Sequence, residues 1–410
     1  MKIPTIPSRY LVLADQVVFS GGSFVLSLSL ARLLDTHHFG VYSALVLIGY
    51  LLLSVTNALV IQPFQVSVAG FEKSPSYPFF SLFIQILLVV LLCSLYLAFT
   101  ATGWLTGFLP ATFAPGIVLW LAAFLMQDFF RKAFLALSKP GLSLLSDVLA
   151  VLSQIVVLGY LWLNPGFSFS ALMNLLALAY VPSVILGLAD FQYSEMFSGN
   201  WKSFWNAHRS QGGWLLLTAV VQWWTNNLFT VASGVFIGVE ALGAFRLVQS
   251  LFGILNMVFQ TFENHLLPEA SRLFKLSVEE SKDFLKASFR QNGWPLVAVL
   301  VALFIFSQEV MVLAGGAKFG SYHMIIKGMT VLYGCILIGY PVRLAIRMML
   351  LNQTFFIGYV LAFGFSLLSF RFLLEHFQLW GALAGLLINQ LIMLIYWNKQ
   401  LVSHQFNVWK

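Results

Sequence analysis

Long apolar stretches follow one another along almost the whole chain, and each is about as long as a lipid bilayer is thick. Charged residues make up 9% of the 410 residues, against about 25% in a typical soluble domain. A soluble fold of this size would need a charged surface that this composition cannot supply, so the apolar side chains are expected to face lipid. We therefore predict an all-α integral membrane protein.

Twelve of these stretches approach the ~20 residues that a membrane-spanning helix needs. They run approximately over 10–34, 40–68, 79–101, 113–137, 141–163, 168–189, 210–237, 244–268, 292–314, 323–350, 354–374 and 379–401. The first stretch is too long for the core of a signal peptide and has no small-residue cleavage site after it, so we expect it to be retained.

The basic residues indicate the orientation. With the N-terminus in the cytoplasm, seventeen of the 22 Lys and Arg residues lie at cytoplasmic ends of the predicted spans. The five at the opposite ends are Arg32, Arg246, Lys318, Lys327 and Arg371. Because basic residues collect in cytoplasmic loops, both termini are predicted to be cytoplasmic. The net charge of +7 is then a topology signal, and it does not indicate nucleic-acid binding.

Two longer segments fall on the predicted cytoplasmic side. Segment 195–210 places Trp201, Phe204 and Trp205 on one helical face, which is typical of an interfacial helix. Segment 276–294 opens with the capping box from Ser277 to Glu280 and continues with Lys and Arg at every fourth residue. It predicts a basic amphipathic helix on the inner leaflet, with partner docking as the alternative.

The chain also repeats itself weakly. "FGVYSALVLIGYLLL" (39–53) and "LGAFRLVQSLFGILN" (242–256) lie 203 residues apart, and Pro63 and Pro268 follow late in the corresponding spans. Two parallel six-helix lobes fit this pattern, with chance similarity between apolar helices as the alternative. The predicted lobes cover 1–195 and 210–410, joined by an interfacial linker over 196–209. We predict hinges at both prolines; static kinks are the alternative.

Charged residues inside the predicted fourth and fifth spans raise a separate question. Asp128, Arg131 and Lys132 precede the turn at Lys139-Pro140, and Asp147 follows it at a similar depth. We predict a structural clamp in which Asp147 pairs with Arg131 or Lys132, and Asp128 reaches the same cations. Snorkelling to the interface and contact with a substrate are the alternatives.

The richest polar pattern lies in the predicted span over 244–268. Spacings of three and four residues put six positions on one helical face: Arg246, Gln249, Gly253, Asn256, Gln260 and Glu263. Further polar residues lie in the first, second and seventh predicted spans: Asp15, Arg32, Asn57, Asn226 and Asn227. Polar side chains are costly against lipid, so the stripe should face protein or water. The alternative for each amide is hydrogen bonding between helices.

Two segments resemble a known family. "DQVVFSGGSFVLSLSLARLLDTHHFGVYSAL" (15–45) and "DFFRKAFLALSKPGLSLLSDVL" (128–149) are similar to the opening and to the fourth-to-fifth-span hairpin of the polysaccharide biosynthesis, or O-antigen, flippases. These belong to the MOP superfamily (multidrug/oligosaccharidyl-lipid/polysaccharide). The resemblance implies a V-shaped transporter of twelve helices, with a cavity lined by the first, second, seventh and eighth spans.

The resemblance also implies a function, which is flipping of a polyprenyl-pyrophosphate-linked oligosaccharide to the outer leaflet of the bacterial inner membrane. Arg246 and Arg32 would hold the pyrophosphate, because the guanidinium fork suits phosphate oxygens. The amides of the substrate site would contact sugars: Gln249, Asn256, Gln260, Asn226, Asn227 and Asn57. Asp15 and Glu263 are candidates for ion coupling.

Other functions remain as alternatives. A multidrug or small-cation exporter of the same fold is the first, and a non-transport partner of a polysaccharide polymerase is the second. No Asp-x-Asp pair and no Gly-rich phosphate loop occur, so we predict no enzyme, no metal and no cofactor. The expected partners are the bilayer, the lipid-linked oligosaccharide and other polysaccharide-assembly proteins.

Overall fold

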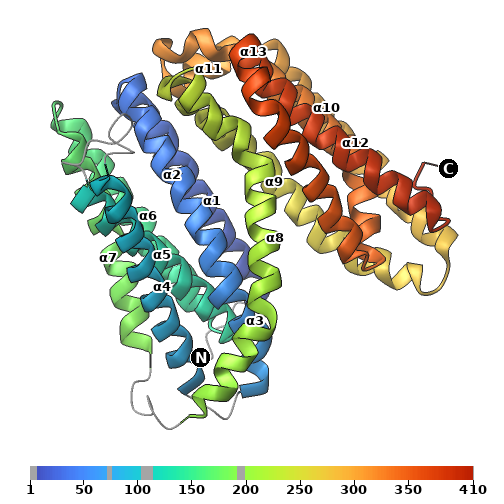
Figure 1. Cartoon of the computed structure of the whole chain (residues 1–410), viewed down its shortest axis with the longest axis horizontal. Coiled ribbons are helices and arrows are strands. Elements are labelled where there is room, and N and C mark those ends of the chain that lie inside the picture. The colour runs from blue at the N-terminus through green and yellow to red at the C-terminus, as the bar shows by residue number, and fades with distance from the viewer. Residues whose placement is uncertain (1–6, 72–75, 103–113, 192–198, 410) are drawn as a thin grey trace, which may run out of the picture. The chain divides into compact units, whose positions relative to one another are not determined.

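The computed structural model describes residues 7–71, 76–102, 114–191 and 199–409, and these fold into helices without a β-strand (Figure 1). The chain divides into two compact units. Unit 1 contains residues 1–33 and 45–220, and unit 2 contains residues 34–44 and 221–410. The first turns of the second predicted span therefore belong to unit 2. The lobe boundaries expected from the sequence stay a prediction.

Unit 1 is built from the following elements: α1 (Ser8–Leu33), most of α2 (Thr36–Thr56), the π-helix η1 (Asn57–Ile61), α3 (Gln62–Ser67), the 3₁₀ turn η2 (Val68–Phe71), α4 (Ser76–Ala101), α5 (Ala114–Ala136), α6 (Pro140–Leu163), α7 (Phe169–Asp190) and the first part of α8 (Trp201–Phe236). Helix α6 packs against α1, α5 and α7. Helix α6 starts directly after the predicted turn, in which Ser138 has a positive φ of 58°. Pro140 occupies the first turn of α6. Proline is tolerated there because the backbone N–H groups of a first turn have no acceptor within the helix.

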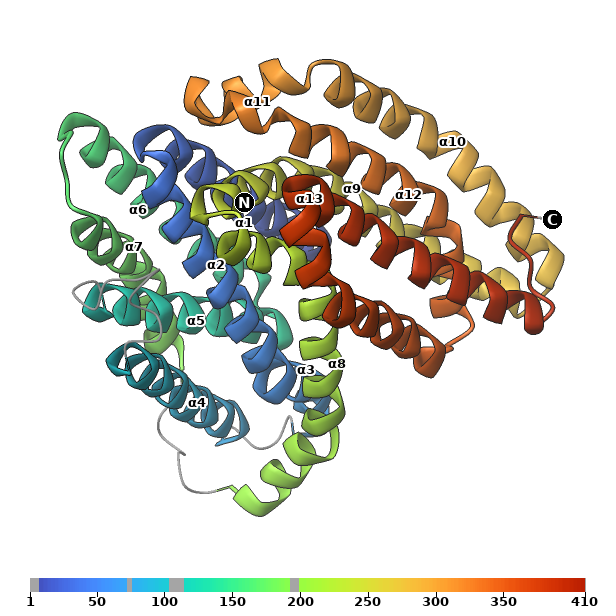
Figure 2. The same ribbon diagram turned by 45° about the horizontal axis from the view of Figure 1, so that its top comes forward.

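Unit 2 contains the rest of α8 and the following elements: α9 (Val239–Phe274), α10 (Val278–Ile305), α11 (Ser307–Gly315), the 3₁₀ turn η4 (Ala317–Tyr322), α12 (His323–Met348) and α13 (Asn352–Ser403). Helices α10 and α13 both pack against α12, as the two ribbon views show (Figures 1 and 2). Ser277 caps α10 by accepting a hydrogen bond from the Glu280 backbone N–H at 3.4 Å. The predicted amphipathic segment continues without a break into the apolar part of α10, so it is not a separate helix.

Nine helical stretches of the described residues are long and apolar enough to cross a bilayer. The protein is therefore a multi-pass membrane protein. Helices α5 and α8 are outside this set, and α13 is a single stretch of 52 residues. That stretch covers two predicted spans and changes direction at Gln378, whose φ of 47° is not helical. The number of twelve spans stays a prediction.

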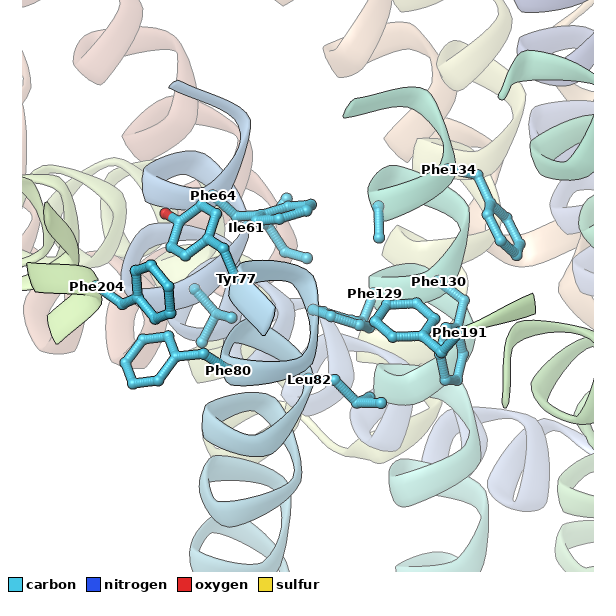
Figure 3. Close-up of a cluster of buried hydrophobic side chains, with 12 residues drawn as sticks. Ile61, Phe64, Tyr77, Phe80, Leu82, Phe129, Phe130, Phe134, Phe191 and Phe204 are labelled. Atoms are coloured by element: carbon cyan, nitrogen blue, oxygen red, sulfur yellow. The ribbon is translucent and has the colours of Figure 1, made fainter. Parts of the chain in front are cut away.

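Aromatic side chains form much of the core of unit 1 (Figure 3). Phe129 and Phe130 of α5 belong to the same buried cluster as Tyr77 of α4 and Phe204 of α8. His208 follows Phe204 by one turn of α8, and its Nε2 is 3.2 Å from the Tyr77 hydroxyl. The start of α8, expected to lie in the membrane interface, is thus fixed to the protein core by Phe204, because burying a large aromatic ring is strongly favourable.

A close helix contact in unit 2 joins residues from the two repeated segments. A Cβ atom on Gly243 of α9 would lie 2.9 Å from the Cα of Gly40, at the start of α2. One turn away, His37 Nδ1 lies 3.2 Å from Glu240 Oε1. Both pairs have the separation of 203 residues found in the sequence repeat. Glycine is needed here because only its missing side chain lets the two backbones approach this closely.

Candidate functional site

The most buried charged groups of unit 1 surround Arg131 of α5. Its Nη1 lies 3.3 Å from Asp15 Oδ2 on α1 and 3.5 Å from Asp147 Oδ2 on α6. All three side chains are at most 8% exposed. The guanidinium carbon also lies 3.9 Å from the centre of the Phe19 ring. Arg131 thus joins three helices through ion pairs and a cation–π contact.

Neutral side chains complete the hydrogen bonds of the two carboxylates. Ser143 Oγ donates to Asp15 Oδ1 at 2.8 Å, and Gln127 Nε2 donates to Asp147 Oδ1 at 2.8 Å. The other Asp147 oxygen accepts no hydrogen bond within the described part of the chain. A buried carboxylate with an oxygen that accepts no hydrogen bond is costly, so Asp147 depends on the nearby Arg131 for stabilisation.

A second ion pair of unit 1 lies close in sequence to the first. Lys132 Nζ is 2.8 Å from Asp128 Oδ2 and donates to Asn57 Oδ1 at 2.8 Å. Asn57 is the first residue of the π-helix η1, and Pro63 follows in the first turn of α3. A π-helix next to a proline interrupts the regular α-helical hydrogen bonds of the second predicted span. The lysine therefore connects α5 to the irregular part of that span.

The charges of these five ionisable groups do not balance. Asp15, Asp128 and Asp147 carry three negative charges when ionised, against two positive charges on Arg131 and Lys132. Two of the carboxylates share a single guanidinium. Like charges brought together in a buried site favour protonation of one of them. With all five groups ionised, the cluster carries one more negative than positive charge.

The predicted clamp residues are thus brought together, with a different division of partners. Arg131 contacts Asp147 across the hairpin, as the sequence predicts, while Lys132 pairs with Asp128 on its own helix. Sequence reasoning did not place Asp15 in this cluster, and it missed Ser143 and Gln127. Ser143 lies four residues before Asp147 and so on the same face of α6, which was a signal available in the sequence.

The polar stripe of α9 begins with a contact between its own residues. Arg246 Nη1 lies 3.5 Å from Gln249 Oε1, and Gln249 Nε2 donates to the Thr230 hydroxyl of α8 at 3.1 Å. Further along the stripe, Asn256 and Gln260 are exposed. The stripe therefore combines one amide held between helices with two amides that are accessible to a ligand.

The two predicted amides of α8 differ from each other. Asn226 is exposed, while Asn227 Nδ2 donates to the Trp223 carbonyl of its own helix at 2.9 Å. Asn57, predicted to contact sugars, accepts its hydrogen bond from Lys132. Among these three amides, Asn226 is the most available for a substrate, because each of the others already has a partner inside the protein.

Glu263, the last residue of the stripe, contacts two arginines of α12. It forms an ion pair with Arg347 and lies 4.0 Å from Arg343 Nη2. The carboxylate partner of both arginines therefore comes from α9. With two cations beside one carboxylate, this group of charges is positive overall.

The remaining predicted residues are Arg32, Pro63 and Pro268. Arg32 is exposed in the last turn of α1 and belongs to unit 1, whereas Arg246 belongs to unit 2. Their joint contact with one pyrophosphate stays a prediction. Pro268 is exposed inside α9 and Pro63 is buried, and the hinge role of both also stays a prediction.

The comparisons with known proteins give structural matches. An inward-facing multidrug resistance MATE family transporter of the MOP superfamily aligns with a TM-score of 0.71 and 13% identity, over 99% of this chain and 97% of that one. The lipid II flippase MurJ, in an inward closed conformation, aligns with a TM-score of 0.68 and 13% identity, over 97% and 87% of the two chains. The chain has the MOP transporter fold.

A third structure with this fold is a MOP superfamily transporter from Pyrococcus furiosus, with a TM-score of 0.64 and 11% identity over 98% of this chain and 97% of that one. No protein-family model and no curated protein sequence matches the chain. The MOP fold is found here in a drug transporter and in a lipid flippase, so the fold by itself does not choose the substrate. That choice depends on the side chains.

Proposed function

We propose that this protein is a flippase that moves a polyprenyl-pyrophosphate-linked oligosaccharide from the cytoplasmic to the outer leaflet of a bacterial inner membrane. The observation that carries the proposal is the charge of the α9 stripe. Its acidic residue, Glu263, is bound to Arg343 and Arg347, while Arg246 stands at the other end beside a neutral amide. A stripe with this charge favours an anionic substrate over a cationic drug.

The residue types also suit the two parts of such a substrate. A guanidinium presents several N–H donors in one plane and can contact two phosphate oxygens at once. The exposed amides of Asn256, Gln260 and Asn226 can donate to and accept from sugar hydroxyls. We therefore propose that Arg246 holds the pyrophosphate and that the exposed amides contact the sugars.

Two candidates for ion coupling can be compared on their surroundings. The Glu263 side chain is 13% exposed and already contacts two arginines. Asp15 is buried and shares the single guanidinium of Arg131 with Asp147, so that two carboxylates face one cation. We propose that Asp15 with Asp147 is the coupling site, with the proton as the coupling ion, and that Glu263 has a structural role.

The runner-up is a multidrug exporter, which would use a buried carboxylate to bind a cationic drug. The acidic residues Asp15, Asp128 and Asp147 supply carboxylates, but each already contacts a basic side chain. A non-transport role beside a polysaccharide polymerase is the third candidate. It would not require the exposed amides of α9.

Replacement of Arg246 tests the flippase. Arg246→Ala should abolish complementation of a flippase-deficient bacterial strain at normal protein levels, because the pyrophosphate loses its cation. Arg246→Lys keeps the charge and loses the planar fork, so it should complement in part. Arg371→Ala is the control, since this arginine is exposed and pairs with Glu375 on its own helix. Full complementation by Arg246→Ala would remove Arg246 from the site.

A further inference from the structure

An apolar groove of about 630 Å³ runs between α10 and α12 of unit 2. Its volume lies in the range of ~300–1,000 Å³ that is typical of small-molecule sites. On α10 it extends from Phe289 to Phe304, which is about 22 Å at 1.5 Å per residue. One leaflet contributes about 15 Å, half of the ~30 Å hydrocarbon core. The groove can therefore hold an acyl chain of one leaflet along its whole length.

Small residues create this groove. Gly293 of α10 and Gly334 of α12 both border it, and Thr330 is the neighbour of Gly334 one turn away. A Cβ atom built on Gly334 would have no atom within 4 Å, so open space lies directly above this glycine. The space results from missing side chains between two packed helices.

One end of the groove carries a positive charge. Arg290 borders the groove there, next to the exposed Trp294. Both lie where the basic amphipathic part of α10 passes into its apolar part, and tryptophan and arginine are favoured at this level of the bilayer. Arg290 forms no ion pair with an acidic side chain of the described residues, whereas Arg272 is paired with Glu269. Its charge is available to a ligand.

We propose that this groove is a binding site for an anionic phospholipid, with one acyl chain lying between α10 and α12 and the phosphate on Arg290. The lipid is supplied by the surrounding bilayer. The basic residues Lys282 and Lys286 precede Arg290 at intervals of four residues and attract anionic headgroups to the same end. Lys282 also lies 5.5 Å from the Phe406 ring of the C-terminal segment. The proposal does not depend on the transported substrate.

Native mass spectrometry of the purified full-length protein tests this site. The protein is incubated with phosphatidylglycerol or with phosphatidylcholine of the same acyl composition, and retained lipid is measured after release from detergent. The wild type should retain one phosphatidylglycerol in preference to phosphatidylcholine. Arg290→Gln should weaken that retention about tenfold, because a charge-assisted contact is lost. Arg272→Gln is the control and should behave as the wild type, because Arg272 is paired with Glu269 and does not border the groove.

A second variant pair tests the groove itself. Gly334→Leu places a side chain in the open space and should remove the bound phospholipid. Gly364→Leu is its control, since Gly364 of α13 also has no atom within 4 Å of a built Cβ and does not border the groove. Equal retention by the wild type, Arg290→Gln and Gly334→Leu would overturn the proposal. Equal affinity of the wild type for phosphatidylcholine and phosphatidylglycerol would also overturn the proposal. Displacement of bound phosphatidylglycerol by an equimolar amount of polyprenyl phosphate would overturn it as well.

Discussion

Each unit contains a buried polar cluster, and the two clusters differ in charge. In unit 1 the cluster is ionic, with Arg131 between Asp15 and Asp147. In unit 2 it is neutral: Asn389 Nδ2 donates to the Thr225 carbonyl at 3.0 Å, and Ser366 Oγ donates to Asn389 Oδ1 at 2.9 Å. Both join helices that are distant in the sequence.

The difference in charge separates two roles of buried polar groups in membrane proteins. The neutral cluster has donors matched to acceptors, and such hydrogen bonds hold helices together with a modest gain in stability. The ionic cluster has more carboxylates than cations, so its charge can change when it gains or loses a proton. We therefore expect the neutral cluster to be structural and the ionic cluster to be both structural and functional.

The largest effect should follow from removing the cation of unit 1. Arg131→Met leaves two buried carboxylates without a countercharge, and it should lower the free energy of unfolding by about 3–5 kcal/mol. Unfolding in detergent, followed by circular dichroism, measures this. Adding Asp15→Asn should recover part of the loss, because one unpaired carboxylate is then neutral. An unchanged stability of Arg131→Met would show that the cluster does not hold unit 1 together.

A double-mutant cycle sharpens this result. Asp147→Ala and Arg131→Ala should each lower the stability, and the loss in the double variant should be smaller than the sum of the two single losses, because both changes remove the same ion pair while Arg131 also pairs with Asp15. Losses that add fully would mean that the two residues do not interact energetically.

The second effect concerns function. Asp15→Asn keeps the shape of the side chain, but its single amide oxygen can accept from Ser143 or from Arg131 and not from both, so the free energy of unfolding should fall by about 1–3 kcal/mol. Transport should lose its dependence on the proton gradient, since the cluster can no longer exchange a proton at this position. Substrate flipping in vesicles with and without a gradient measures this. Glu263→Gln is the comparison and should keep the gradient dependence; an Asp15→Asn protein that keeps it too would rule Asp15 out.

A smaller effect is expected for the neutral cluster. Asn389→Ala removes the hydrogen bond from α13 to α8 and the one that joins the two parts of α13, and it should lower the free energy of unfolding by about 0.6–1.7 kcal/mol. The same unfolding experiment applies, with Ser369→Ala as a control, because Ser369 donates its hydrogen bond to the Phe365 carbonyl of its own helix. A loss as large as that of Arg131→Met would remove the energetic difference between the clusters.

The smallest change in stability is expected at the prolines. Pro63→Ala and Pro268→Ala should leave the fold intact and should alter which ends of α3 and α9 become accessible during transport, because a regular helix bends less easily than one interrupted by proline. Labelling of introduced cysteines from either side of the membrane measures this. Identical labelling with normal transport would show that the two prolines are static kinks.

The membrane class and the helices were predictable from the sequence. Lipid cannot satisfy backbone polar groups, so long apolar stretches must form helices wherever they occur. The pairing of Arg131 with Asp147 was also predictable, because the short turn at Lys139-Pro140 makes α5 and α6 antiparallel neighbours and sets both residues at the same depth. These inferences need only distances along the chain.

The partners from distant helices were decided by the tertiary structure. Asp15 reaches Arg131 across 116 residues, Asn57 reaches Lys132, and Glu263 reaches Arg347. Each contact depends on which helices pack together and on how each helix is rotated about its axis. Lipid-facing and buried positions are both apolar, so hydropathy gives little information about that rotation. The ion pairs form where packing of the helices brings opposite charges to the same depth, and this is a property of the folded unit.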